Sequence, residues 1–73
     1  MNAREWLNGY AARIGVDPPT DDELKQLLDL AAEAAHSSER IAAPVACWLS
    51  ARAGLEPADA LGPAREVAGG EEA

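Results

Sequence analysis

The chain has little of what a small protein ordinarily uses to hold itself together. Its 73 residues include one cysteine, two tryptophans, one tyrosine and no phenylalanine. A lone cysteine excludes an intramolecular disulfide, and a chain this short buries only about 60% of the surface that its unfolded form exposes. Cys47 lies in the apolar run 45–49, so we interpret it as a small core residue in a reducing compartment. Because bulky side chains are few and no disulfide bond can stabilise the fold, we expect self-association, most simply as a homodimer.

Basic residues and long apolar runs are also scarce. Thirteen acidic residues stand against six basic ones, a net charge of −7. Nucleic acid and anionic membrane both require a basic surface, so we expect the chain to bind neither. No apolar stretch of 18 residues occurs, and residues 1–5 do not lead into the hydrophobic region of a signal peptide. We therefore expect a cytoplasmic protein.

Apolar residues recur at helical spacing, and no segment alternates in the way that a strand requires. The spacing predicts an all-α fold, a compact bundle of three to four short helices. We expect helices over about 2–14 and 21–36, a third that begins between residues 38 and 43 and ends near 53, and a weaker fourth from Pro57 that bends or breaks at Gly62-Pro63. Residues 1–68 would form a single domain, with a disordered tail at 69–73.

The helix predicted over 21–36 has the clearest start signal. Thr20 and Glu23 form a capping box, in which each side chain accepts a hydrogen bond from the backbone amide of the other residue. Leu24, Leu27 and Leu28 recur along one face of this helix, and we expect Leu28 in the core. Glycines close the neighbouring helices at positions 15 and 54.

Residues that could support catalysis or bind a metal are too few. Glu33 and His36 have the Glu-x-x-His spacing of di-iron carboxylate bundles, but those bundles need two such motifs and two further glutamates. Cys47 has apolar neighbours, whereas a reactive thiolate needs an electropositive and accessible setting. The sequence contains no phosphate-binding loop, dinucleotide-binding turn or Cys-x-x-Cys pair. We expect a protein that is not an enzyme and binds no metal or cofactor.

The turn at residues 36–44 concentrates the distinctive polar residues. His36 and Arg40, together with the amides that open the next helix, could form a cationic pocket for a carboxylate or phosphate. The alternative is a structural tie in which Arg40 pairs with Glu33, Glu39 or a backbone carbonyl. We expect the structural role, because a single arginine rarely defines an anion site.

The two tryptophans, Trp6 and Trp48, are most simply core residues. However, so small a domain does not readily bury both rings. A partly exposed tryptophan flanked by alanines is suited to the centre of a contact patch. Trp48 is therefore a candidate contact residue.

Residues 28–44 resemble the signature of a small bacterial family of unknown function. The shared pattern is Leu-Ala-x-x-x-Ala-His-x-x-x-Arg-x-Ala-Ala-Pro, matched here from Leu30 to Pro44, and the N-terminal Trp6 agrees as well. Similar proteins occur alone or attached to molybdenum cofactor guanylyltransferase and are often labelled molybdopterin-guanine dinucleotide biosynthesis proteins. The catalytic motifs of that enzyme are absent from this sequence. The resemblance implies a place in that pathway without the reaction, with His36, Arg40 and Pro44 as partner or ligand contacts.

Three functions remain open from the sequence. The first is a non-catalytic accessory or protein-interaction domain, which the resemblance links to a molybdenum cofactor guanylyltransferase. The second is a small anion-binding or cofactor-binding helical module that uses the His36–Arg40 turn. The third is a self-assembling helical module without a ligand.

Overall fold

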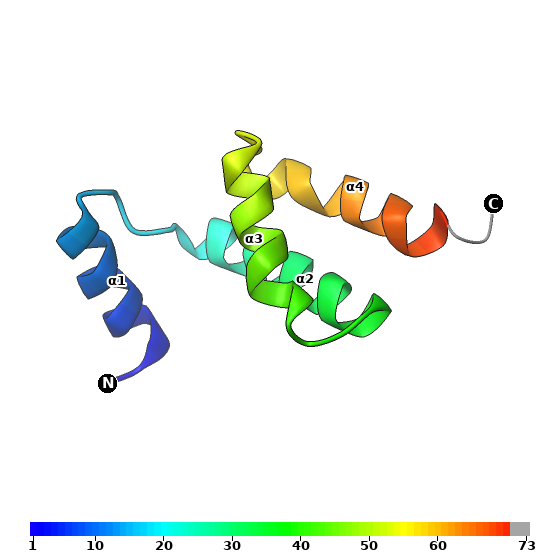
Figure 1. The fold of residues 1–73 in the computed structure, drawn as a ribbon. Helices are drawn as coiled ribbons and strands as arrows, with labels where there is room; N and C mark the ends of the chain where they lie inside the picture. Colours follow the sequence, from blue (N-terminus) through cyan, green and yellow to red (C-terminus); the bar gives the residue numbers. More distant parts are fainter. Residues whose placement is uncertain (71–73) are drawn as a thin grey trace.

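The computed structural model describes residues 1–70 as four α-helices with no strand among them (Figure 1). The helices are α1 (Ala3–Ile14), α2 (Asp21–Ser37), α3 (Ala42–Arg52) and α4 (Pro57–Gly70). The all-α prediction is confirmed, and the predicted bounds of the first three helices agree to within about one residue. None of these four helices is both long and apolar enough to cross a lipid bilayer.

Local side-chain chemistry sets the helix ends. At the start of α2 the Thr20 hydroxyl accepts from the Glu23 amide at 3.1 Å, and the Glu23 carboxylate accepts from the Thr20 amide at 2.8 Å. Asn2 and Glu5 form a second capping box at the start of α1, which the sequence analysis missed. Gly15 ends α1 with a positive φ of 81°, a conformation that glycine adopts at no steric cost.

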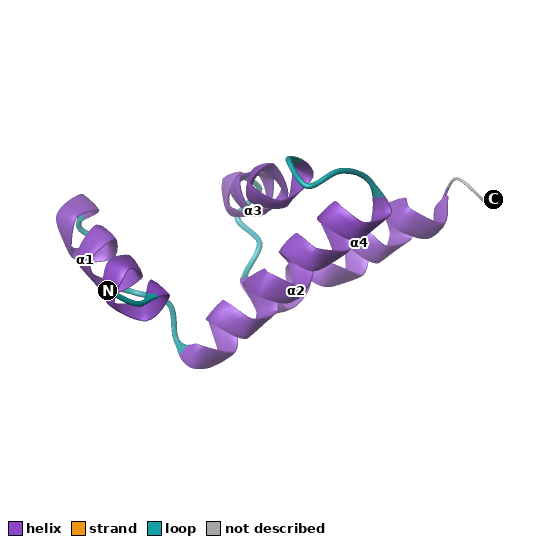
Figure 2. Ribbon diagram, turned by 90° about the horizontal axis from the view of Figure 1, so that it is seen from below, coloured by secondary structure: helices purple, strands orange, loops and turns teal. Residues whose placement is uncertain are grey.

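Helix α2 is the centre of the fold. Helix α3 crosses it, and α4 runs alongside it (Figures 1 and 2). Helix α1 lies apart from these three in both views and is joined to them by residues 15–20. The Arg4 guanidinium donates to the Pro19 carbonyl and to the Asp21 carboxylate, so it ties α1 to the start of α2.

The buried core is very small. Only Ala11, Leu30 and Ala60 are buried among the hydrophobic side chains of the described residues. Leu28, which we expected in the core, is 60% exposed, so that prediction is wrong. Successive residues of a helix are turned by about 100°, and the side of α2 that faces α3 and α4 is centred between Leu27 and Leu30. Leu28 is turned about 130° from this centre and therefore lies on the exposed side of α2.

Helix α4 continues through Gly62-Pro63, where we expected it to bend or break, so no break occurs there. It begins at Pro57, passes through Gly62 and Pro63, and includes Gly69 and Gly70. Pro63 and Gly62 are exposed, whereas Ala60 on the inner side is buried. The carbonyl that loses its amide donor at Pro63 is on an exposed residue, Asp59, where water can replace the donor. The rest of the predicted tail, residues 71–73, lies outside the described residues.

Most of the large apolar side chains remain at the surface. Twelve of them are at least 40% exposed: Met1, Trp6, Tyr10, Ile14, Val16, Leu28, Ile41, Val45, Trp48, Leu49, Leu55 and Val67. Nine of the twelve lie on α1 or α3 or within two residues of their ends.

Candidate interaction surface

The turn between α2 and α3 uses its hydroxyl groups internally. The Ser37 Oγ–H donates to the Glu33 carbonyl and the Ser38 Oγ–H donates to the Ala34 carbonyl, both at 2.6 Å. These bonds satisfy carbonyls of the last turn of α2 that have no intrahelical partner. His36, in the same turn, is exposed at the negative end of the helix dipole. The two hydroxyls therefore have no proton left to donate to a ligand.

The start of α3 is equally short of donors. The amide of Ala42 donates to the Glu39 carbonyl at 3.0 Å, and that of Ala43 donates to the Arg40 carbonyl at 3.1 Å. The next residue, Pro44, has no amide hydrogen. A shallow depression beside this helix start is lined by Ser38, Glu39, Ile41, Ala42 and Val45. It combines apolar side chains with one carboxylate, which gives an anion little to bind.

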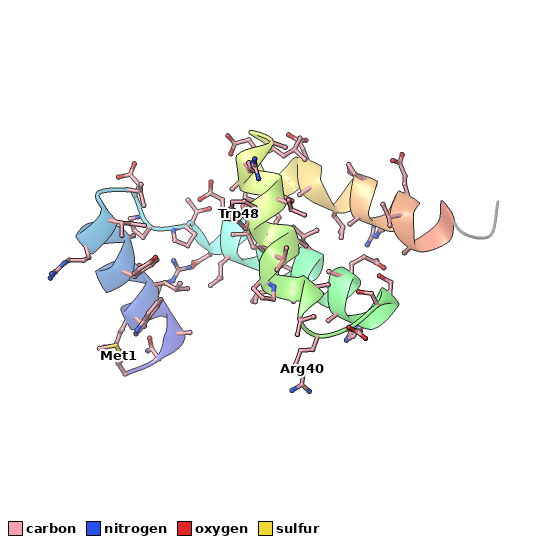
Figure 3. All side chains as sticks on the ribbon, viewed as in Figure 1. Met1, Arg40 and Trp48 are labelled. Carbon is pink, nitrogen blue, oxygen red and sulfur yellow. The ribbon has the colours of Figure 1, made fainter. Side chains whose placement is uncertain are left out.

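Arg40 does not form the structural tie that we expected. Its side chain extends away from the fold (Figure 3), and no described residue forms an ion pair with it within 4.0 Å. Glu33, one of the three partners expected, instead lies with its Oε1 atom 3.8 Å from Nε of Arg65 on α4. The arginine is thus available to a group outside this chain.

One side of α3 presents a continuous apolar strip, which we call the α3 face and define as Ile41, Val45 and Trp48. These side chains are 74%, 52% and 59% exposed. Their spacing of four and three residues places them on one side of the helix over two turns. Pro44, exposed in the first turn, borders the strip. The structure therefore brings two predicted contact residues, Pro44 and Trp48, to one surface, whereas His36 lies on α2.

Two cationic side chains border the α3 face. The guanidinium carbon of Arg52 lies 5.1 Å from the centroid of the Trp48 ring, a cation–π arrangement, and Arg40 precedes Ile41 at the other end. Arg52 was not singled out from the sequence. Its spacing of four residues from Trp48 on one helix is the signal that could have identified it.

A second apolar surface lies on α1. The rings of Trp6 and Tyr10 stack with their centroids 5.0 Å apart and their planes at 21°, and the two side chains are 54% and 51% exposed. Together with Met1, Glu5, Gly9 and Arg13 they line a shallow hollow. The sequence analysis treated Trp6 mainly as a core residue, and the structure places it on the surface.

Cys47 is half-buried between α3 and α2. Its thiol lies 3.9 Å from the Leu27 carbonyl oxygen, a weak hydrogen bond. Desolvation by burial raises the pKa of the Cys47 thiol above its ordinary value. The thiol is therefore protonated at neutral pH, which agrees with the interpretation of Cys47 as a packing residue.

The described residues contain no cluster of three or more histidine, cysteine, aspartate or glutamate side chains placed to share a metal ion. Within the Glu33–His36 motif, Glu33 is engaged by Arg65 as described above. Among the surface features described above, the exposed apolar strips on α1 and α3 are each bordered by charged side chains.

These features define a small all-α domain whose most distinctive surfaces are unpartnered helix faces. The chain belongs to the family described as domain of unknown function (DUF6457), which it matches over residues 1–71. This match confirms that the resemblance is to a family of unknown function. No curated protein and no solved structure matches the chain.

Proposed function

We propose that this chain is a non-catalytic protein-interaction domain that binds a partner protein through the α3 face. The observation that carries the proposal is the exposure of Ile41, Val45 and Trp48 on one side of a helix. Transferring this much apolar side chain from water into an interface is favourable by about 25 cal/mol per Å². A large exposed aromatic ring with apolar neighbours is also typical of the residues that dominate binding energy.

The charges around the α3 face specify the chemistry of the partner. Arg40 and Arg52 stand at its two ends, in a chain whose net charge is −7. A complementary partner would present an apolar patch bordered by carboxylates, which could pair with both guanidinium groups. The Arg52 side chain already lies over Trp48, so the ring and the cation are partly ordered before binding.

The resemblance stated above supplies a specific partner to test, a molybdenum cofactor guanylyltransferase. In this proposal the domain acts as an accessory to that enzyme, because the resemblance implies that proteins of similar pattern occur attached to it. The reaction itself would remain with the enzyme.

The test is a calorimetric titration of a purified guanylyltransferase with the domain. Trp48→Ala should weaken binding by at least about 30-fold, which corresponds to about 2 kcal/mol for the loss of a central aromatic side chain. Arg40→Ala should also weaken binding and leave the melting temperature nearly unchanged, because this side chain has no ion-pair partner among the described residues. Glu66→Ala, a substitution at an exposed position of α4, is the matched control and should bind like the parent.

Circular dichroism establishes that the variants are folded before they are compared. Unchanged affinity of the Trp48→Ala variant would contradict the use of the α3 face. A complete lack of binding by the parent domain would contradict this choice of partner.

A further inference from the structure

Helix α1 presents a surface that its own chain leaves uncovered. We call this surface the α1 stripe and define it as Glu5, Trp6, Gly9, Tyr10 and Arg13. The two stacked aromatic rings are half-exposed, and α1 stands apart from the other three helices (Figures 1 and 2). The stripe follows the spacing of one helix side, with intervals of three and four residues.

Gly9, at the middle of the stripe, has no role within the chain that requires a glycine. Its φ is not positive, and a Cβ atom built on it would meet nothing within 4 Å. A glycine inside a helix costs about 1 kcal/mol relative to alanine. The lack of a side chain does, however, allow another backbone to approach closely. The cost is offset if a second helix crosses α1 at this position.

The charges of the stripe are arranged symmetrically around Gly9. Glu5 lies four residues before it and Arg13 four residues after it, so each charge is about 6 Å from Gly9 along the helix axis. One Glu5 oxygen accepts from the Asn2 amide at 3.0 Å, and the other oxygen has no partner among the described residues. No described residue forms an ion pair with Arg13 within 4.0 Å. Both groups can therefore pair outside the chain.

We infer that two copies of this chain pair through their α1 helices, antiparallel and related by a two-fold axis near Gly9. In this arrangement Glu5 of each copy lies beside Arg13 of the other, and the aromatic rings of both copies cover the two glycines. A surface patch that complements itself in this way is characteristic of two-fold dimers. The stripe carries one charge of each sign, so two chains of net charge −7 would meet at a surface that has no net charge.

The exposed area of the molecule is consistent with a second copy. The chain exposes 5644 Å². A compact protein of its mass, 7.6 kDa, exposes about 4,300 Å². The excess of about 1,300 Å² is larger than the roughly 800 Å² per partner of a standard interface. This pairing does not depend on the proposed partner binding, because it uses α1 rather than α3.

The first test is sedimentation at total protein concentrations from about 1 to 100 μM, the range that resolves dissociation constants near the micromolar level. The parent should dimerise. Gly9→Leu should weaken the dimer at least tenfold while helicity stays equal or rises, because leucine is a better helix former than glycine. Asn8→Leu is the matched control, since residue 8 points about 100° away from residue 9, and its dimer should be at least as tight as the parent's. Trp48→Ala, on α3, should also leave the dimer unchanged.

The charge pairing is tested by reversal. Arg13→Glu should weaken the dimer at least tenfold, and the combined substitution Glu5→Lys with Arg13→Glu should restore it, because the opposite charges then face each other again. Circular dichroism on each variant separates a loss of pairing from a loss of folding. A dimer that responds to neither Gly9→Leu nor Arg13→Glu would overturn the inference, as would a parent that stays monomeric throughout the concentration range.

The crossing point is tested by cross-linking in a Cys47→Ala background under oxidised glutathione. At a two-fold axis a residue meets its own copy, so Gly9→Cys should form an intermolecular disulfide, which requires Cα atoms within about 7 Å. The Asn8→Cys variant should form much less of the intermolecular disulfide under the same conditions. Equal cross-linking of the two variants would overturn the antiparallel crossing at Gly9.

Discussion

Leu28 and Leu30 are chemically identical and two residues apart, yet the fold treats them oppositely. Leu30 is 2% exposed and Leu28 is 60% exposed. Two residues along a helix correspond to about 200° of rotation, so the two side chains point to nearly opposite sides of α2. Because α3 and α4 cover only part of the helix circumference, one leucine is enclosed and the other remains in contact with water.

The stability of the domain should therefore depend on Leu30 far more than on Leu28. Leu30→Ala should lower the free energy of unfolding by about 2–5 kcal/mol, the usual cost of truncating a fully enclosed leucine. Leu28→Ala should cost less than about 1 kcal/mol, because most of its side chain is already hydrated. Urea unfolding of the two variants beside the parent measures the difference. Equal losses for the two variants would contradict the packing described for α2.

Cys47 should make stability depend on pH in the alkaline range. Burial raises the pKa of its thiol in the folded state, so the unfolded chain loses this proton at a lower pH than the folded chain. The contribution is fully present below the unfolded pKa of about 8.5 and decreases as the pH rises toward the folded pKa. Urea unfolding at pH 7.5, 8.5 and 9.5 should show the parent losing stability relative to Cys47→Ala as the pH increases. Parallel pH profiles would show that the thiol ionises alike in both states.

At the scale of the element, α4 combines weak helix-forming residues with a continuous helical path. Pro63 lies in its interior, beside Gly62 and close to Gly69 and Gly70. Its inner side supplies Ala60, which is buried, while the exposed Arg65 side chain reaches Glu33 on α2. Packing against α2 therefore supports a helix that local propensity disfavours.

Restoring the missing amide donor should strengthen α4. Pro63→Ala should raise the free energy of unfolding by about 1–3 kcal/mol, since a helix-interior proline costs about 3 kcal/mol and part of the gain is offset by a more flexible unfolded chain. Gly62→Ala is a matched comparison with a smaller expected gain of about 0.5–1 kcal/mol, because a Cβ atom there meets open space. Urea unfolding and the helical signal in circular dichroism report both changes. A loss of stability on Pro63→Ala would indicate that α4 depends on the proline.

At the scale of the whole molecule, the four helices leave two apolar surfaces uncovered. The α1 stripe lies on a helix tied to the rest mainly through Arg4, and the α3 face lies on the side of α3 that no other helix covers. Three buried hydrophobic residues among the described ones are few for an independent domain. Assembly through both surfaces would supply burial that the isolated chain lacks, with one surface used by a second copy and the other by a different protein.

The sequence by itself determined the helices and most of their ends. Capping pairs such as Thr20 with Glu23, and stop signals such as Gly15, act within one turn of backbone. Their effect depends on neighbours a few residues away, so the pattern of residue types is sufficient to predict it. The sequence also indicated that Trp6 and Trp48 do not both fit inside so short a chain, but it did not determine which of them is exposed.

Only the tertiary structure decided which side of each helix is covered. The exposure of Leu28, the continuity of α4 through Pro63 and the pairing of Glu33 with Arg65 rather than Arg40 all depend on where α3 and α4 lie against α2. The Glu33–Arg65 contact joins residues 32 positions apart, and many helix placements satisfy the same local periodicity. Helix α1 lies away from the other helices, which leaves Trp6 and Tyr10 on the surface. This too is a property of the assembled fold, because local periodicity identifies the apolar side of a helix but does not determine what covers that side.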